Sequence, residues 1–219
     1  MGRKYYILSY FIITSALIFC SIPLTVKAVE DTKPFMTNAD SFVGEENPDT
    51  NFGGYTYLKV GYDNNWSKAF LKFDLINVPS IFHKAELRIA FLHVENNSLL
   101  DFYETNSGWG EYSITWNNAP PFGDLITSVS IPEGQELYKH VKIDITDKLE
   151  SITGFWSIGI NSSIQKLVRI APKEQAPVPL IMFYYQTSDI LMFSKIILVG
   201  SLGLVIIAVA FYQASIKKK

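Results

Sequence analysis

Two long stretches without a charged residue lie near the ends of the 219-residue chain, at positions 5–26 and 196–216. As an α-helix, the second stretch of 21 residues would extend about 31 Å, close to the roughly 30 Å hydrocarbon core of a bilayer. A chain with such stretches does not fold along its whole length as one water-soluble domain. We therefore expect a central domain that is exported and fixed to a membrane.

The first stretch has the features of a secretory signal peptide. It follows Arg3 and Lys4, and it ends at the sequence Val26-Lys27-Ala28, where a small residue marks a cleavage site. The pattern predicts a signal peptide over residues 1–28. Because the stretch is long, an uncleaved signal anchor is the alternative.

The second stretch predicts a single transmembrane helix over residues 196–216, reached through a juxtamembrane tether over residues 188–195. The lysines at 217–219 form a basic stub, and basic flanks stay on the cytoplasmic side. The positive charges before residue 5 also favour the inside. Residues 29–187 are therefore expected outside the cell, whether or not the signal is cleaved, and the C-terminus in the cytoplasm.

Charge is divided between the ends and the middle of the chain. All 21 acidic residues lie between Glu30 and Asp189 with only 12 of the 19 basic ones, which leaves this part with a net charge of −9. A negative domain gives no reason to expect a nucleic-acid partner. The single cysteine, Cys20, excludes an internal disulfide and a cysteine-based zinc site.

The middle of the chain carries the two-residue alternation of half-buried strands. Apolar side chains alternate with polar ones over residues 69–75, 85–91, 141–145 and 156–160, and residues 179–185 form a closing apolar strand. Turn sequences rich in Gly, Pro, Asn and Asp separate these segments. One short helix is predicted at residues 146–152, with Thr146 as N-cap. The pattern predicts an all-β, antiparallel β-sandwich of the jelly-roll type.

Several blocks resemble the DNRLRE (disaggregatase-related) domain family, which is similar to carbohydrate-binding module family 96. They are ADSFV at 39–43, NFGG at 51–54, YLKVG at 57–61, FLKFDL at 70–75 and WGEYSITWNNAP at 109–120. The last block is similar to that family's W-x-E-x-x-(V/I)-T-W-N-x-x-P signature. The resemblance covers about residues 38–185. It implies an extracellular β-sandwich that is often a non-catalytic module beside polysaccharide-active enzymes or on cell surfaces.

The tryptophan motif has a structural interpretation and a functional one. Large aromatic side chains on strands commonly anchor a core, and Thr and Asn side chains tie the loops that follow. We expect structural roles for this set, with Trp116 in the core: Trp109, Glu111, Thr115, Trp116 and Asn117.

A second aromatic group surrounds a Gly- and Asn-rich turn. Flat rings stack on the apolar faces of sugars, while Lys and Asn donate hydrogen bonds to hydroxyl groups. The predicted ligand-binding residues are Tyr55, Tyr57, Trp66 and Lys68, with Tyr62 and Lys59 nearby. Plain strand alternation, with half of these rings inside the sandwich, is the alternative interpretation.

Metal, catalytic and modification sites give weaker patterns. The oxygen-bearing residues Asp40, Glu45, Glu46, Asp49 and Asn51 are of the type that calcium prefers, but their spacing is not that of a dedicated loop. His83, His93 and His140 lie in separate segments, which argues against zinc. No catalytic residues are predicted, although carboxylate pairs for glycoside hydrolysis exist among Glu45, Glu46, Asp101, Glu104 and Glu111. Asn65, Asn96 and Asn161 are N-glycosylation acceptors.

Three classes of function remain open from the sequence. The first is a surface module that binds polysaccharide or serves adhesion without catalysis, and we favour it. The second is a structural subunit of an envelope or membrane protein complex. The third is a small membrane-anchored hydrolase of polysaccharides. No cofactor other than calcium is expected.

The topology is testable in cells. Protease added to intact cells is expected to remove residues 29–187 and leave a small anchored fragment, because both basic flanks favour the cytoplasm. Immunoblotting of a C-terminal tag measures the fragment. Cleavage seen only after permeabilisation would contradict the prediction.

Overall fold

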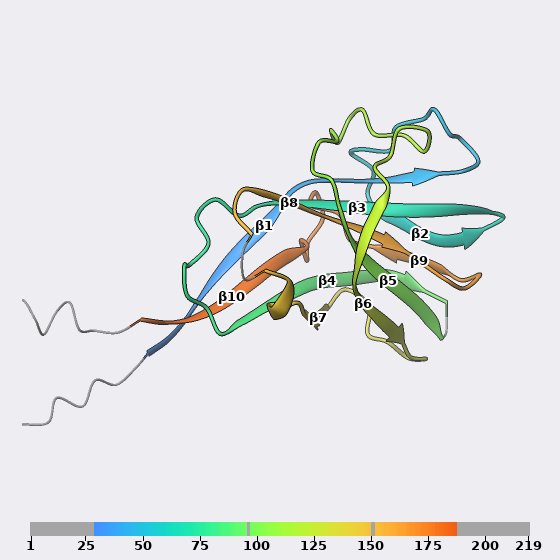
Figure 1. The fold of residues 1–219 in the computed structure, drawn as a ribbon. Coiled ribbons are helices and arrows are strands. Elements are labelled where there is room, and N and C mark those ends of the chain that lie inside the picture. Colours follow the sequence, from blue (N-terminus) through green and yellow to red (C-terminus); the bar gives the residue numbers. More distant parts are fainter. Residues whose placement is uncertain (1–28, 96, 150–151, 188–219) are drawn as a thin grey trace, which may run out of the picture. The chain divides into compact units, whose positions relative to one another are not determined.

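A computed structural model describes residues 29–95, 97–149 and 152–187, and it folds them into antiparallel strands (Figure 1). The all-β prediction is therefore confirmed. The strands are β1 (Val29–Gly44), β2 (Leu58–Asp63), β3 (Asn65–Asp74), β4 (Lys84–Val94), β5 (Ser98–Thr105), β6 (Phe122–Ile131), β7 (His140–Asp144), β8 (Phe155–Asn161), β9 (Leu167–Ile170) and β10 (Leu180–Thr187).

The predicted helix at residues 146–152 is only a short 3₁₀ turn, η1 (Thr146–Lys148). Thr146 does not act as its N-cap. Its hydroxyl group instead donates to Asp144 Oδ1 at 2.6 Å and accepts from the backbone N–H of Ala85 at 3.0 Å. Thr146 thus links the start of β4 to the end of β7 through two hydrogen bonds and does not cap a helix.

Shared pairing partners separate the strands into two layers. Ala69 of β3 pairs with Phe42 of β1 and with Ile160 of β8, so these neighbours lie on opposite edges of β3. The first layer has the order β1–β3–β8–β5–β6.

The second layer is built around β4. Glu86 pairs with Met182 of β10 and with Asp144 of β7 on its other edge. Strand β9 also pairs with β4 and carries β2 on its far side. The β2–β3 hairpin and the β1–β10 pairing join the two layers into an antiparallel sandwich.

The layers enclose one central hydrophobic core. Alternate residues of each inner face contribute to it, as the two-residue pattern predicts. Its fully buried members include Leu71 and Phe73 from β3, Leu87 and Ile89 from β4, and Ile158 from β8. Most of the predicted strand residues thus take the expected face.

A smaller hydrophobic cluster lies on the outer face of β1 and β3. Here Phe70 and Val43 are covered by Trp109 and Ile114 from the β5–β6 connection, which we call the tryptophan loop (residues 106–121). Trp109 donates from Nε1 to Ser157 Oγ at 3.2 Å, and Lys72 lies 4.5 Å from its ring centre. The tryptophan loop thus closes the outer face of the first layer.

The prediction that Trp116 belongs to the core was wrong. Trp109 is buried, with 8% of its surface exposed, whereas Trp116 only packs against the edge of the outer cluster and is partly exposed. Both tryptophans lie in the loop between β5, which ends at Thr105, and β6, which begins at Phe122. The two-residue alternation of a strand therefore does not determine which of their side chains is buried.

The signal peptide, tether and transmembrane helix predicted from the sequence lie outside the described residues. Among residues 29–187, as far as they are described, no helix has the length and hydropathy needed to cross a membrane.

The two tryptophans are expected to differ in their effect on stability. Trp109→Ala should lower the free energy of unfolding of the domain by about 3–5 kcal/mol, as large aromatic truncations in cores do. Trp116→Ala should cost clearly less, about 1–2 kcal/mol, because it removes less buried surface. Urea denaturation followed by fluorescence measures both, and equal losses would contradict this assignment.

Candidate functional site

Three stacked aromatic rings lie beside β2, and we call them the ring pile: Phe52, Phe42 and Tyr57. Phe52 and Tyr57 both stack on Phe42, with ring centres 4.4 and 5.8 Å apart and planes within 16° and 21° of parallel. The guanidinium of Arg169 lies 4.8 Å from the ring centre of Tyr57. Tyr57 is therefore occupied by neighbours within the protein and is a support rather than a free platform.

Tyr55 lies beside this pile and stands at nearly right angles to it. Its ring makes angles of 80–87° with Phe52, Phe42 and Tyr57 at centre distances of 5.2–6.0 Å. It is 44% exposed, and none of the described rings stacks on it. The ring of Tyr55 is thus partly open to solvent, and three other rings fix its direction.

Two cations flank the pile on neighbouring strands. Lys59 of β2 and Arg169 of β9 are direct cross-strand partners, a placement that is destabilising for like charges. Asp63 offsets this repulsion, with its carboxylate 3.0 Å from Lys59 Nζ; the hydrogen bond and charge of Lys59 lower the pKa of Asp63, and the charge of Arg169 adds to this effect. Arg169 makes no salt bridge to any described residue, and its buried Nε has no hydrogen-bond partner there.

These residues form one surface, which we call the Tyr55–Arg169 surface: Tyr55, Tyr57, Lys59 and Arg169. Val168 and Ile170 face the central core, so Arg169 between them faces outward. The sequence analysis named Tyr55 and Tyr57 but not Arg169, since nothing in the sequence relates β9 to the turn before β2.

The other two predicted ligand residues belong to a different group. Trp66 contacts Tyr62 across the β2–β3 hairpin with ring centres 5.3 Å apart. Simple alternation after Leu58 and Val60 would turn Tyr62 inward, but Gly61 has a φ of +95° and interrupts it. A side chain at Gly61 would collide with the carbonyl of Lys166, so only glycine fits this irregularity.

Lys68 lies over the tryptophan loop rather than near Tyr55. Its ammonium is 4.5 Å from the ring centre of Trp116 and 5.2 Å from that of Phe122, and partial burial lowers its pKa. The structure thus brings Tyr55 and Tyr57 together and places Trp66 and Lys68 on the outer face of β3.

The family-like motifs act as ties between distant loops. Asn51 donates from Nδ2 to the carbonyls of Glu111 and Ile114 at 2.8 and 2.7 Å. Gly53 approaches the backbone of Glu111 so closely that a Cβ atom would collide with it. Asn117 donates to Asp49 Oδ1 at 2.8 Å, which fixes the other end of the same loop. The residues that carry the resemblance therefore build the support beneath Tyr55.

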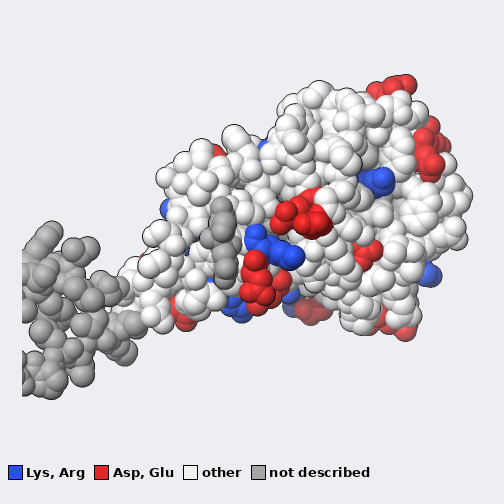
Figure 2. Space-filling view, viewed as in Figure 1, with Lys and Arg blue, Asp and Glu red and all other residues white. Residues whose placement is uncertain are grey.

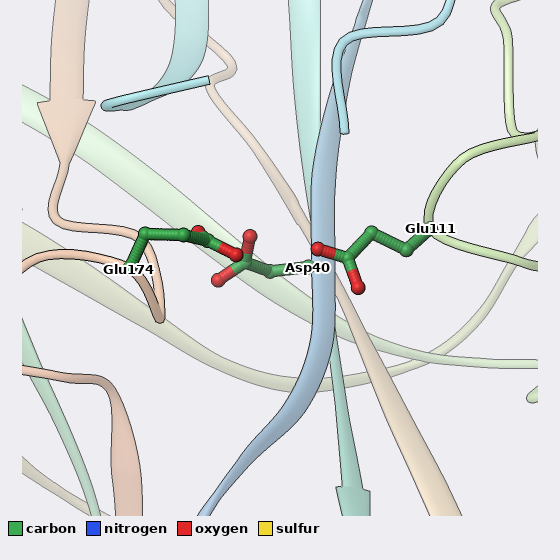
Figure 3. Close-up of side chains that lie close together, drawn as sticks. All are labelled: Asp40, Glu111 and Glu174. Carbon is green, nitrogen blue, oxygen red and sulfur yellow. The ribbon is translucent and has the colours of Figure 1, made fainter. Parts of the chain in front are cut away.

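Three carboxylates from distant parts of the chain meet beside this support. Figure 3 shows Asp40 of β1 between Glu111 of the tryptophan loop and Glu174 of the β9–β10 loop, and their oxygen atoms lie within 4.8 Å of one another. Lys173 pairs with Glu111 at 3.1 Å and with Glu174 at 2.9 Å, and its backbone N–H donates to Asp40 at 2.6 Å. The lysine already supplies a positive charge to the cluster.

Burial raises the pKa of Asp40 to about 7, and the nearby charges of Glu174 and Glu111 add to this effect, although the Lys173 hydrogen bond opposes it. Of the five residues in the predicted calcium loop, only Asp40 joins this cluster. Glu45 accepts a hydrogen bond from the backbone of Trp66, while Asp49 and Asn51 are used in the loop ties.

The remaining predicted positions are spread over the domain. His83 pairs with Glu30 at 3.2 Å, His140 contacts the carbonyl of Val178 at 2.9 Å, and His93 is exposed at a strand end. Asn65 begins β3 and Asn161 ends β8, both half-buried, while Asn96 lies outside the described residues.

Comparison of the sequence with models of known protein families shows to which family the chain belongs. The sequence profile described as carbohydrate-binding module family 96 matches residues 31–183. The chain belongs to this family. The resemblance to family 96 seen in the sequence is thus confirmed, and the module occupies the whole sandwich.

Two other comparisons add little. Among solved structures, a family 61 carbohydrate-binding module in complex with β-1,4-galactotriose aligns over 73% of this chain and 88% of its own. The identity is 13% and the TM-score 0.26, so this alignment supports no conclusion about fold or site. A search of curated proteins finds no significant match.

Asp40 is expected to make the stability of the domain depend on pH. Its pKa is raised from 3.8 to about 7, so the folded state holds the proton more tightly than the unfolded chain does. This carboxyl therefore lowers the free energy of unfolding as the pH rises from about 4 to about 7, by up to about 4 kcal/mol. Asp40→Asn should remove that loss.

The measurement is the difference in unfolding free energy between Asp40→Asn and the wild type at several pH values, which cancels the titrating groups that do not interact with Asp40. The difference should favour the variant increasingly up to about pH 7 and stay level above it. A difference that does not change between pH 4 and pH 8 would contradict the assignment.

Proposed function

We propose that this protein is a cell-surface, non-catalytic module that binds polysaccharide through its Tyr55–Arg169 surface and serves adhesion. In this proposal a jelly-roll β-sandwich is held on the membrane by the C-terminal helix predicted at residues 196–216, with the domain outside. The observation that carries the proposal is the exposed ring of Tyr55 beside Tyr57, which in turn holds a guanidinium that makes no salt bridge with a described residue.

Each element of the Tyr55–Arg169 surface fits one part of a sugar. The open ring of Tyr55 offers a flat apolar surface to the C–H face of a pyranose. Arg169 offers planar N–H donors, which match hydroxyl pairs or a carboxylate. Because Tyr57 holds the guanidinium from below, little freedom is lost when a ligand binds.

The charge distribution favours neutral or mildly acidic glycans. The central part of the chain carries a net charge of −9, and Figure 2 shows acidic and basic side chains intermixed rather than gathered by sign on the face it presents. A densely charged polyanion would be repelled at long range, but screening over about 8–10 Å at physiological salt lets a local arginine act.

A non-catalytic role agrees with the surroundings of the carboxylates. Asp40, with its raised pKa, is the group that resembles a general acid, but only 1% of its surface is exposed and Lys173 covers it. Asp101 accepts a hydrogen bond from Ser128 at 2.5 Å. A glycosidase acid must reach the glycosidic oxygen, and Asp40 is not placed to do so.

Glycan binding is expected to depend on Tyr55 and Arg169. Tyr55→Ala should weaken binding about 3- to 10-fold, the range given by the loss of one aromatic stacking contact. Arg169→Ala should weaken it similarly. Arg169→Lys should not restore affinity for a uronate-containing chain, because the planar fork is lost. Affinity electrophoresis and calorimetry on neutral and uronate-containing polysaccharides measure these effects.

Phe155→Ala is the matched control, since Phe155 is an aromatic residue with 53% of its surface exposed and it pairs with Asp74 at the end of β3, away from the turn that carries Tyr55. It should bind like the wild type. If Tyr55→Ala and Arg169→Ala remain folded and bind as the wild type does, the Tyr55–Arg169 surface has no role. Retention on no glycan, even with many copies on one bead, would contradict carbohydrate binding altogether.

A further inference from the structure

The end of the sandwich that carries the loop between β3 and β4 exposes large apolar side chains. Ile81 is 84% exposed and Ile76 is 63% exposed, both in the loop between β3 and β4, and Met36 and Phe155 are more than half exposed. We call these four residues the apolar end. Exposed aliphatic groups of this size that gather in one place usually mark a contact surface.

The pairing of the strands brings these four residues to one end. Thr37 pairs with Phe73, and Phe155 pairs with Asp74, so Met36 and Phe155 flank the last residues of β3. Lys33 donates to the carbonyl of Asn77 at 2.7 Å, which holds the loop beside β1. Figure 1 shows this loop on the same side as the start of β1 and the end of β10.

The loop is built to present its isoleucines. Val78 and Phe82 pack against the central core, and the Phe82 ring lies 4.9 Å from that of Phe183 at nearly right angles. The backbone N–H of Ile76 is held by Asp74 Oδ1 at 3.1 Å. Between these fixed points, Ile76 and Ile81 project outward, and the segment 75–82 contains no charged residue.

From these features we propose that the apolar end rests on the surface of the lipid bilayer. This inference depends on the membrane anchor of the proposed function. The chain leaves β10 at Thr187, and only eight residues, 188–195, precede the apolar stretch at 196–216. Fully extended, they reach at most about 29 Å. The tether begins beside Val29, on the same side of the sandwich as the β3–β4 loop, so it limits how far this side can move from the bilayer.

The contact would set the direction of the glycan-binding surface. Strand β1 runs from the apolar end to Gly44, and the loop that follows it carries Tyr55 (Figure 1). A domain that rests on Met36, Ile76, Ile81 and Phe155 therefore turns Tyr55 away from the membrane. Aliphatic side chains suit this role because they partition into the acyl boundary without needing hydrogen bonds.

The test uses the full chain with Cys20→Ser in lipid vesicles. A single cysteine at the exposed position Ser80 carries an environment-sensitive dye, and lipids spin-labelled near the headgroup act as quenchers. We expect at least a twofold loss of dye emission. The same dye at Tyr112→Cys should show little quenching, because Tyr112 belongs to the tryptophan loop.

The double variant Ile76→Ser/Ile81→Ser separates lipid contact from mere proximity. Both side chains are exposed, so the midpoint of unfolding should change little while quenching at position 80 falls toward the control value. Quenching that stays the same in this variant would overturn the proposal. Blue-shifted emission without quenching would also overturn it, since it indicates that protein, such as a second copy, covers this end.

Two further measurements on the same labelled chain, flotation with the vesicles and retention on glycan, distinguish failure of the anchor, of the lipid contact and of glycan binding. A chain that does not float with lipid contradicts the anchor and this inference with it. A chain that floats without quenching at position 80 contradicts this inference alone. Loss of glycan retention in a floating, quenched sample contradicts the glycan-binding proposal alone.

Discussion

The need to bury both faces of β3 governs the architecture of this domain. Its inner residues Ala69, Leu71 and Phe73 lie in the central core, while Phe70 on the outer face is equally buried. A strand with apolar groups on both faces needs a second cover, and the tryptophan loop provides it through Trp109 and Ile114. The lysines that alternate with Phe70 keep their charges over aromatic rings. The family signature thus encodes the tryptophan loop that covers the outer face of β3 and the hydrogen bonds that hold this loop in place.

The same contacts position the Tyr55–Arg169 surface. Asn51 and Gly53 hold the turn before β2 against the tryptophan loop, and this turn carries Phe52 into the ring pile and Tyr55 beside it. Phe42 stacks on Tyr57, and the Tyr57 ring in turn contacts the guanidinium of Arg169, which fixes the position of that group. Binding residues on a loop become precise because core-like contacts support them. The residues that carry the family resemblance therefore support the Tyr55–Arg169 surface.

The sequence predicted the strands well and the sites only in part. Period-2 alternation located most strands because it follows directly from burial of one face. The alternation does not extend to Tyr62, because Gly61 interrupts it, and it does not apply to Trp116, which lies in a loop outside the sheet. Arg169, Glu111, Lys173 and Glu174 were not grouped with their partners, because antiparallel pairing joins segments that are distant in sequence. No local pattern encodes a ring pile that combines β1, a turn and β9.

The central claim is that the Tyr55–Arg169 surface binds glycan. Chemical-shift mapping of the isotope-labelled domain during titration with a uronate-containing oligosaccharide tests it most directly. The account predicts that shifts concentrate at residues 54–59 and 168–170, including the Arg169 side-chain signals, and that the surroundings of Trp66 and Lys68 stay unchanged. Shifts centred on Trp66, Lys68 and Trp116 instead would contradict the account and move the site to the outer face of β3.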